Sequence, residues 1–192
     1  MRNCFLAICM LMLVMGIAGA ASALTTLDFE GLPDSYNYMF GGQNIGDYYS
    51  GVTFGPGATI ADRNRGGYND NDYPPHSGDA VFISRDYSYV DITFATTVSY
   101  VEGWFSFSQT GYLEAYDASG AIVDSDSMAP NYGSNGLMSV SAPDIKWVRI
   151  HDHGDFWTGD DIAYGAVPEP SSLLALVTSI GGLGGLMLRR RK

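Results

Sequence analysis

Four carboxylates stand near the two ends of one stretch of the chain, where they could meet around a metal ion. Asp28 and Glu30 are two residues apart, so on a strand both side chains point to the same face. Asp160 and Asp161 lie near the far end of the stretch. If the first and last strands are neighbours, the four acids converge, and Ca²⁺ takes about 6–8 oxygen ligands of this kind. The sequence therefore predicts a structural Ca²⁺ site at Asp28, Glu30, Asp160 and Asp161. The alternative is that Asp28 faces solvent and the Asp160–Asp161 pair only caps a turn.

Residues that could carry out catalysis do not form a recognisable motif. His151-Asp152-His153 could bind Zn²⁺ together with Asp155, but no H-E-x-x-H or similar pair accompanies them. The chain has no G-x-S-x-G, and both cysteines lie within the first nine residues. Its carboxylates are too many for any one pair to indicate a glycosidase. The sequence predicts a protein that is not an enzyme.

Tyrosines gather in two stretches, 34–50 and 62–78, that are rich in Gly, Asn and Asp. Exposed Tyr and Trp side chains offer a flat apolar ring with a polar tip, which suits stacking on sugars. The alternative is that these long loops fold back and bury their aromatic residues. Trp104 and Trp147, which fall inside expected strands, are predicted to be core residues. The predicted ligand-binding residues are Tyr36, Tyr38, Tyr68, Tyr73 and Trp157.

The charge of the middle of the chain limits its partners. Residues 24–166 hold five basic and 20 acidic residues, a net charge of −15. Such a domain repels nucleic acid and anionic lipid and attracts cations. We expect no nucleic-acid partner.

Short strands are the elements that must position these residues. No long helical period occurs in 24–166; runs such as Tyr89–Phe94, Val98–Phe107 and Tyr112–Tyr116 have strand character and end at Gly, Asn, Asp or Pro. About nine or ten strands at this spacing predict an all-β fold, an antiparallel β-sandwich of jelly-roll type.

The N-terminus is typical of a secretory signal helix. Arg2 precedes an apolar run, Cys4–Ile17, and small residues end at Ala21-Ser22-Ala23. The pattern predicts a signal peptide over 1–23, export by Sec-type machinery, cleavage after Ala23, and an ectodomain over 24–166.

The last 26 residues, 167–192, have three parts in order. The triplet Pro168, Glu169 and Pro170 precedes an apolar segment, 173–188, and four cations end the chain. At about 1.5 Å per residue the segment reaches about 24 Å, slightly short of a bilayer core of about 30 Å. The pattern predicts a short transmembrane helix over 173–188 with its cations on the cytoplasmic side.

This triplet, helix and cation order resembles the PEP-CTERM sorting signal of Gram-negative bacteria that make exopolysaccharide. The resemblance implies that an exosortase, a membrane-embedded transpeptidase-like enzyme, recognises Pro168, Glu169 and Pro170 and removes the helix and cations. It also implies an inner-membrane intermediate and a final place at the cell surface or in the extracellular matrix.

The middle of the chain resembles the β-sandwich ectodomains that accompany such tails. The matching segments are Leu27–Leu32, Tyr49–Phe54, Ala115–Gly120 and Asp160–Gly165. Those ectodomains are similar to carbohydrate-binding jelly rolls, some with a structural calcium. The resulting prediction is an exported, exosortase-processed, non-catalytic protein that binds exopolysaccharide in a biofilm matrix. The alternative is a structural or adhesive matrix protein that bridges through divalent cations.

Overall fold

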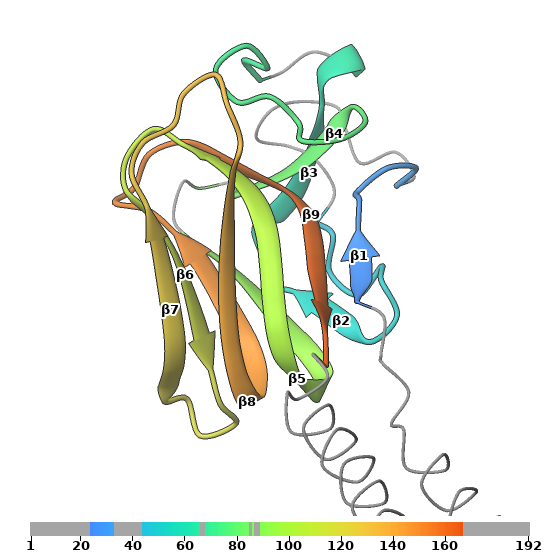
Figure 1. Ribbon diagram of the computed structural model, residues 1–192. Coiled ribbons are helices and arrows are strands. Elements are labelled where there is room, and N and C mark those ends of the chain that lie inside the picture. The colour runs from blue at the N-terminus through green and yellow to red at the C-terminus, as the bar shows by residue number, and fades with distance from the viewer. Residues whose placement is uncertain (1–23, 33–43, 66–67, 85, 87–88, 167–192) are drawn as a thin grey trace, which may run out of the picture. The chain divides into compact units, whose positions relative to one another are not determined.

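The computed structural model describes residues 24–32, 44–65, 68–84, 86 and 89–166 (Figure 1). The predicted signal peptide with its cleavage site at Ala23 lies outside these residues. So do Tyr36, Tyr38 and the tail 167–192 with its Pro168-Glu169-Pro170 triplet. Among the described residues, no helix has the length and apolar character needed to cross a membrane.

The described residues form nine strands and one 3-10 turn. In chain order they are β1 (Thr25–Leu27), β2 (Val52–Phe54), β3 (Ala58–Asp62), η1 (Arg63–Arg65), β4 (Ala80–Ser84), β5 (Tyr89–Phe107), β6 (Gly111–Tyr116), β7 (Ile122–Met128), β8 (Gly136–His151) and β9 (Trp157–Gly165).

All pairings among these strands are antiparallel, which confirms the predicted all-β antiparallel class. Hydrogen bonds join them in the order β3-β4-β9-β5-β8-β6-β7, with β1 on β9 and β2 on β5. The first and last strands are neighbours, as expected, with Leu27 opposite Ile162.

The two longest strands, β5 and β8, make the layers. Their shared register shifts between Thr93 and Val98 and again before Tyr100, and extra residues of this kind bend a strand pair. Figure 1 shows both strands folding back at the bend. The later half of β5 pairs with β9, and its first half pairs with β2. The later half of β8 pairs with β6. The inward side chains of the two layers therefore face each other.

The space between the layers is filled by aromatic and branched side chains. Phe105 and Phe107 on β5 are fully buried, and Trp157 on β9 packs 5.9 Å from Phe107, measured between ring centroids. A Cβ on Gly111 would overlap the Phe107 ring, so this position of β6 needs glycine. Burying one such side chain contributes roughly 1.5–3 kcal/mol, and these contacts fix how the two layers pack.

Strands β3 and β4 are buried on both faces. One face joins the main core, and the other forms a smaller cluster of Ala61, Val81 and Ile83 beneath Tyr68 and Tyr73. The segment 68–78 therefore covers an apolar sheet face.

Candidate functional site

Three of the five aromatic residues that the sequence favoured as sugar contacts are buried; the other two, Tyr36 and Tyr38, lie outside the described residues. Tyr68 is 9% exposed, Tyr73 is 7% exposed, and Trp157 is 1% exposed. Tyr73 packs edge-on against Phe156 at 4.6 Å, and Trp157 begins β9 inside the core. The prediction that these three residues are exposed ligand contacts is wrong, because Tyr68 and Tyr73 cover the apolar face of β3 and β4 and Trp157 lies in the main core. Burial also raises the pKa of Tyr68 and Tyr73.

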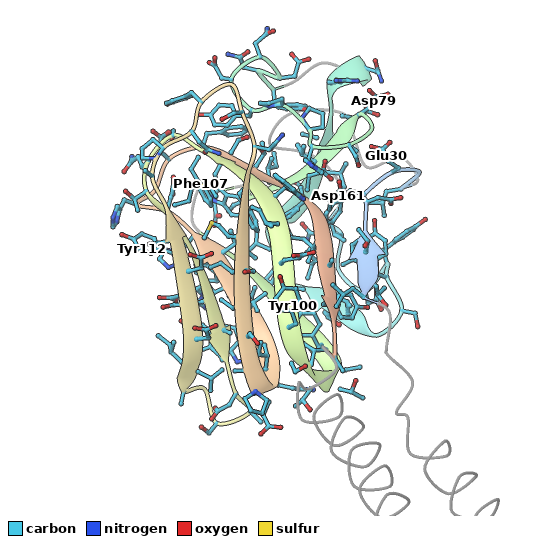
Figure 2. All side chains as sticks on the ribbon, viewed as in Figure 1. Glu30, Asp79, Tyr100, Phe107, Tyr112 and Asp161 are labelled. Atoms are coloured by element: carbon cyan, nitrogen blue, oxygen red, sulfur yellow. The ribbon has the colours of Figure 1, made fainter. Side chains whose placement is uncertain are left out.

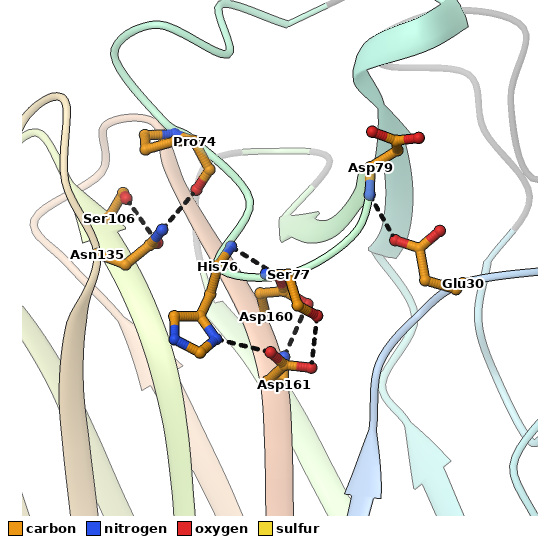
Figure 3. Close-up of polar contacts among 9 residues, drawn as sticks. All are labelled: Glu30, Pro74, His76, Ser77, Asp79, Ser106, Asn135, Asp160 and Asp161. Atoms are coloured by element: carbon orange, nitrogen blue, oxygen red, sulfur yellow. Dashed lines mark hydrogen bonds and ion pairs between the residues drawn. The ribbon is translucent and has the colours of Figure 1, made fainter.

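Two of the predicted metal ligands hold a loop instead. Oε1 of Glu30 accepts the amides of Asp79 and Ala80 at 2.7 and 2.8 Å (Figure 3). Asp160 accepts the amides of His76 and Ser77 at 2.8 and 3.0 Å through Oδ2. These contacts attach the segment 76–80 to β9 and to the residues that follow β1.

Asp161 continues this attachment. Its φ of +45° lies in the left-handed region, at a bulge where β9 has one more residue than β5 between Glu102 and Trp104. The bulge points Asp161 at the same loop, where it contacts His76 Nδ1 at 2.7 Å and accepts from Ser77 Oγ at 3.1 Å (Figure 3). The His76 ring stacks on Trp104, 3.9 Å between centroids. Burial raises the pKa of Asp160 to about 6, against the donors that hold it ionised.

This arrangement does not fit a cation cage. Asp28 is exposed and accepts the Glu30 amide at 3.3 Å through Oδ1, as in a turn. Glu30 and both oxygens of Asp160 accept backbone N–H groups, which a metal would have to displace. Within the described parts of the chain, no three His, Cys, Asp or Glu side chains gather as metal ligands. The calcium site remains a prediction that the geometry does not support, and the same holds for zinc at His151 and His153.

A different arrangement lies on the outer face of the layer that contains β6, the first part of β5 and the later half of β8. We call it the three-rung face. Alternate residues of β5, β8 and β6 point outward, and the register aligns them in three rows across the strands. Figure 2 shows Tyr112 on the outside of the sheet. From β5 through β8 to β6, the rungs are Tyr89, His151 and Tyr112; Asp91, Arg149 and Glu114; and Thr93, Trp147 and Tyr116.

The middle rung is built on Arg149. Its Nε and Nη2 donate to the two oxygens of Asp91 at 2.7 and 2.8 Å, and this pair raises the pKa of Arg149. The guanidinium carbon also lies 3.9 Å from the Tyr89 ring centroid and 5.4 Å from that of Trp147. Arg149 therefore holds one fixed position across all three rungs.

The outer rungs are ring stacks. Tyr116 and Trp147 lie parallel with centroids 3.7 Å apart, and Tyr112 lies 5.0 Å from His151. The Tyr116 hydroxyl donates to Glu114, and burial together with that carboxylate raises the pKa of Tyr116 to about 12. Rings held this way lose little conformational freedom when a ligand arrives.

A hollow of about 510 Å³ opens beside the first two rungs. The Tyr89 ring at this edge is 48% exposed. The lining residues are Tyr89, Glu114, Arg149, His151, Asp152, His153 and Gly154.

Sequence reasoning missed the three-rung face because it assigned strand aromatics to the core. Trp147 is half-buried on this face, and Trp104 is half-buried on the other layer against His76. The available signal was the period of two. In Tyr112–Tyr116 and Trp147–His151, aromatic or charged residues alternate with apolar ones, so they must share the face opposite the core.

Comparison with known proteins gives only distant likenesses. No family model and no curated protein matches the chain. The K2 cleaved adhesin domain of Lys-gingipain is 13% identical, with 74% of this chain and 99% of that domain covered and a TM-score of 0.48. The K1 domain from Porphyromonas gingivalis W83 is 12% identical, with 77% and 100% covered and a TM-score of 0.46. A family 29 carbohydrate-binding module complexed with cellulohexaose is 8% identical, with 77% and 95% covered and a TM-score of 0.46. TM-scores below 0.5 are too low to fix the fold or function of this chain.

Proposed function

We propose that the protein is an exported, non-catalytic polysaccharide-binding protein whose jelly-roll-like β-sandwich binds glycan on the three-rung face. In this proposal the protein acts at the cell surface or in the extracellular matrix of a Gram-negative bacterium. Exosortase processing at Pro168-Glu169-Pro170 releases the protein from an inner-membrane intermediate.

The single observation that carries the proposal is the three-rung face itself. Aromatic rings with polar tips surround a fixed guanidinium and two carboxylates, which together offer apolar area, hydrogen-bond donors and acceptors. Binding sites for polar ligands combine these same features: apolar lining with a few fixed polar groups. A purely structural face needs neither the hollow nor the ring stacks aligned along it.

The test is glycan-array binding by the full-length protein and by Trp147→Ala. We expect binding to at least one polysaccharide class and a loss of about tenfold or more in the variant, because it loses apolar contact area as well as ring stacking, which contributes about 0.5–1.5 kcal/mol beyond that area. Trp104→Ala, on the other layer, is the matched control and keeps its affinity. Absence of binding to every glycan, with and without Ca²⁺, would favour a structural matrix role.

The processing step is tested separately by mass spectrometry of the mature C-terminus. We expect the four terminal cations to be absent from released and cell-associated protein. A mature chain that still ends at Lys192 would contradict exosortase processing.

A further inference from the structure

A buried carboxylate oxygen at the hollow lacks a partner. Asp152 is 7% exposed and lines the hollow. Its Oδ1 accepts the amides of Gly154 and Asp155 at 2.8 and 3.1 Å, which forms the turn after β8. Its Oδ2 has no hydrogen-bond partner among the described residues. A buried acceptor left in this state costs about 1–3 kcal/mol, which a donor from a ligand would recover.

The charges around the hollow favour a cationic donor. Arg149 is already paired with both oxygens of Asp91, so its charge is compensated. Two carboxylates remain on the lining, those of Glu114 and Asp152. Glu114 accepts the hydrogen bond from Tyr116 through Oε2, and the same oxygen makes the 3.6 Å contact with His151. The surrounding net charge of −15 over residues 24–166 adds a field that attracts cations and repels acidic polymers.

We infer that the hollow binds a protonated amino group of an amino-sugar polymer, held by Asp152 and Glu114, with the sugar ring beside Tyr89. This inference rests on the proposed glycan-binding function and names its ligand class. The ammonium donates to Oδ2 of Asp152 and to the Glu114 carboxylate. A polymer of uronic acids is excluded by repulsion.

The experiment compares two oligosaccharides that differ only in the amino group. The full-length protein is titrated by calorimetry with glucosamine hexaose and with its fully N-acetylated form, at mildly acidic pH where amines are protonated. We expect the amine form to bind at least about tenfold more tightly, since a hydrogen bond to a charged group contributes about 1.5–3 kcal/mol. Added salt should reduce this preference through screening.

Two variants test whether Asp152 and Glu114 produce the preference for the amine form. Asp152→Asn keeps the Oδ1 acceptor of the turn, and Glu114→Gln keeps an acceptor for Tyr116, so both preserve the local fold. Each should remove most of the preference for the amine form. Asp144→Asn, an exposed carboxylate of β8 outside the hollow, has the same charge change and should leave the preference intact. Unchanged melting curves would show that the variants are folded.

The outcomes separate the inference from the proposed function. Equal binding of the two hexaoses, or a preference that survives Asp152→Asn and Glu114→Gln, would overturn the amino-sugar assignment and leave glycan binding in place. No binding of any glycan by the full-length protein would overturn both.

Discussion

The segment 68–80 and the three-rung face are built from similar residues, and the fold uses them in opposite ways. The segment buries Tyr68 and Tyr73 over β3 and β4 and is attached through Glu30 and Asp160. The face keeps Tyr112, Tyr116 and Trp147 half-exposed and braced against one another. The difference shows that position relative to the sheet, and not residue type, decides which aromatics can meet a ligand.

Two tryptophan variants give the clearest test of this difference between buried and half-exposed aromatic residues. Trp157→Ala should lower the free energy of unfolding by about 3–5 kcal/mol, because it leaves a cavity in the core. Trp147→Ala should lower it by only about 1 kcal/mol, since its ring stack is half-exposed. Urea denaturation of both variants measures this. Equal losses would show that Trp147 is a core residue after all.

Loss of the loop attachment at Glu30 should give the next largest decrease in stability. Glu30→Ala removes the acceptor of two amides, so we expect about 2 kcal/mol of destabilisation and faster hydrogen exchange at Asp79 and Ala80. Glu30→Gln keeps one acceptor oxygen and should lose about half as much. Slow exchange at both amides in Glu30→Ala would mean that another group holds the loop.

The pH dependence of the same attachment follows from Asp160. Its pKa of about 6 exceeds the value of 3.8 in an unfolded chain, so the folded state holds this proton more tightly. The stabilising contribution is complete below about pH 3.8 and is lost as the pH rises through about 6. The carboxyl carbon of Asp160 should titrate near pH 6 by NMR. A titration near 3.8 would mean that the amides of His76 and Ser77 outweigh burial.

The smallest effect concerns a hydroxyl on the three-rung face. Tyr116→Phe removes the hydrogen bond to Glu114 and keeps the ring stack, so we expect at most about 1 kcal/mol of destabilisation. The pKa values of Tyr49 and Tyr116 are both raised to about 12, so spectrophotometric titration of the variant should show one tyrosine fewer near pH 12 than the wild type. Loss of the Trp147 stack in the variant would show that the hydroxyl, and not the ring, sets the geometry.

The fold class was predictable because it depends on local patterns. Consecutive residues alone show the alternation of polar and apolar side chains in Tyr112–Tyr116 and the end of that strand at Asp117–Gly120. The adjacency of the first and last strands also followed from general sandwich topology. The fold-back of β5 and β8 did not, because it arises from a register shift between strands that are distant in sequence.

The candidate site was less predictable, since it depends on which face a strand turns to the core. Trp147 was predicted to be a core residue, and only the pairing of β8 with β5 and β6 shows that it shares an outward face with Arg149, Asp91 and Glu114. Likewise, the partners of Asp160 lie 83 and 84 residues away, so spacing could not show that backbone amides already occupy it.

The most direct test of the three-rung face is tryptophan fluorescence during titration of the full-length protein with exopolysaccharide. Trp157 is fully buried in the core, and Trp104 lies on the other layer under His76, so neither should respond. We predict a saturable change in emission that disappears in Trp147→Phe, while Trp104→Phe keeps it. Saturable binding with the same emission change in Trp147→Phe would contradict the assignment of the glycan site to this face.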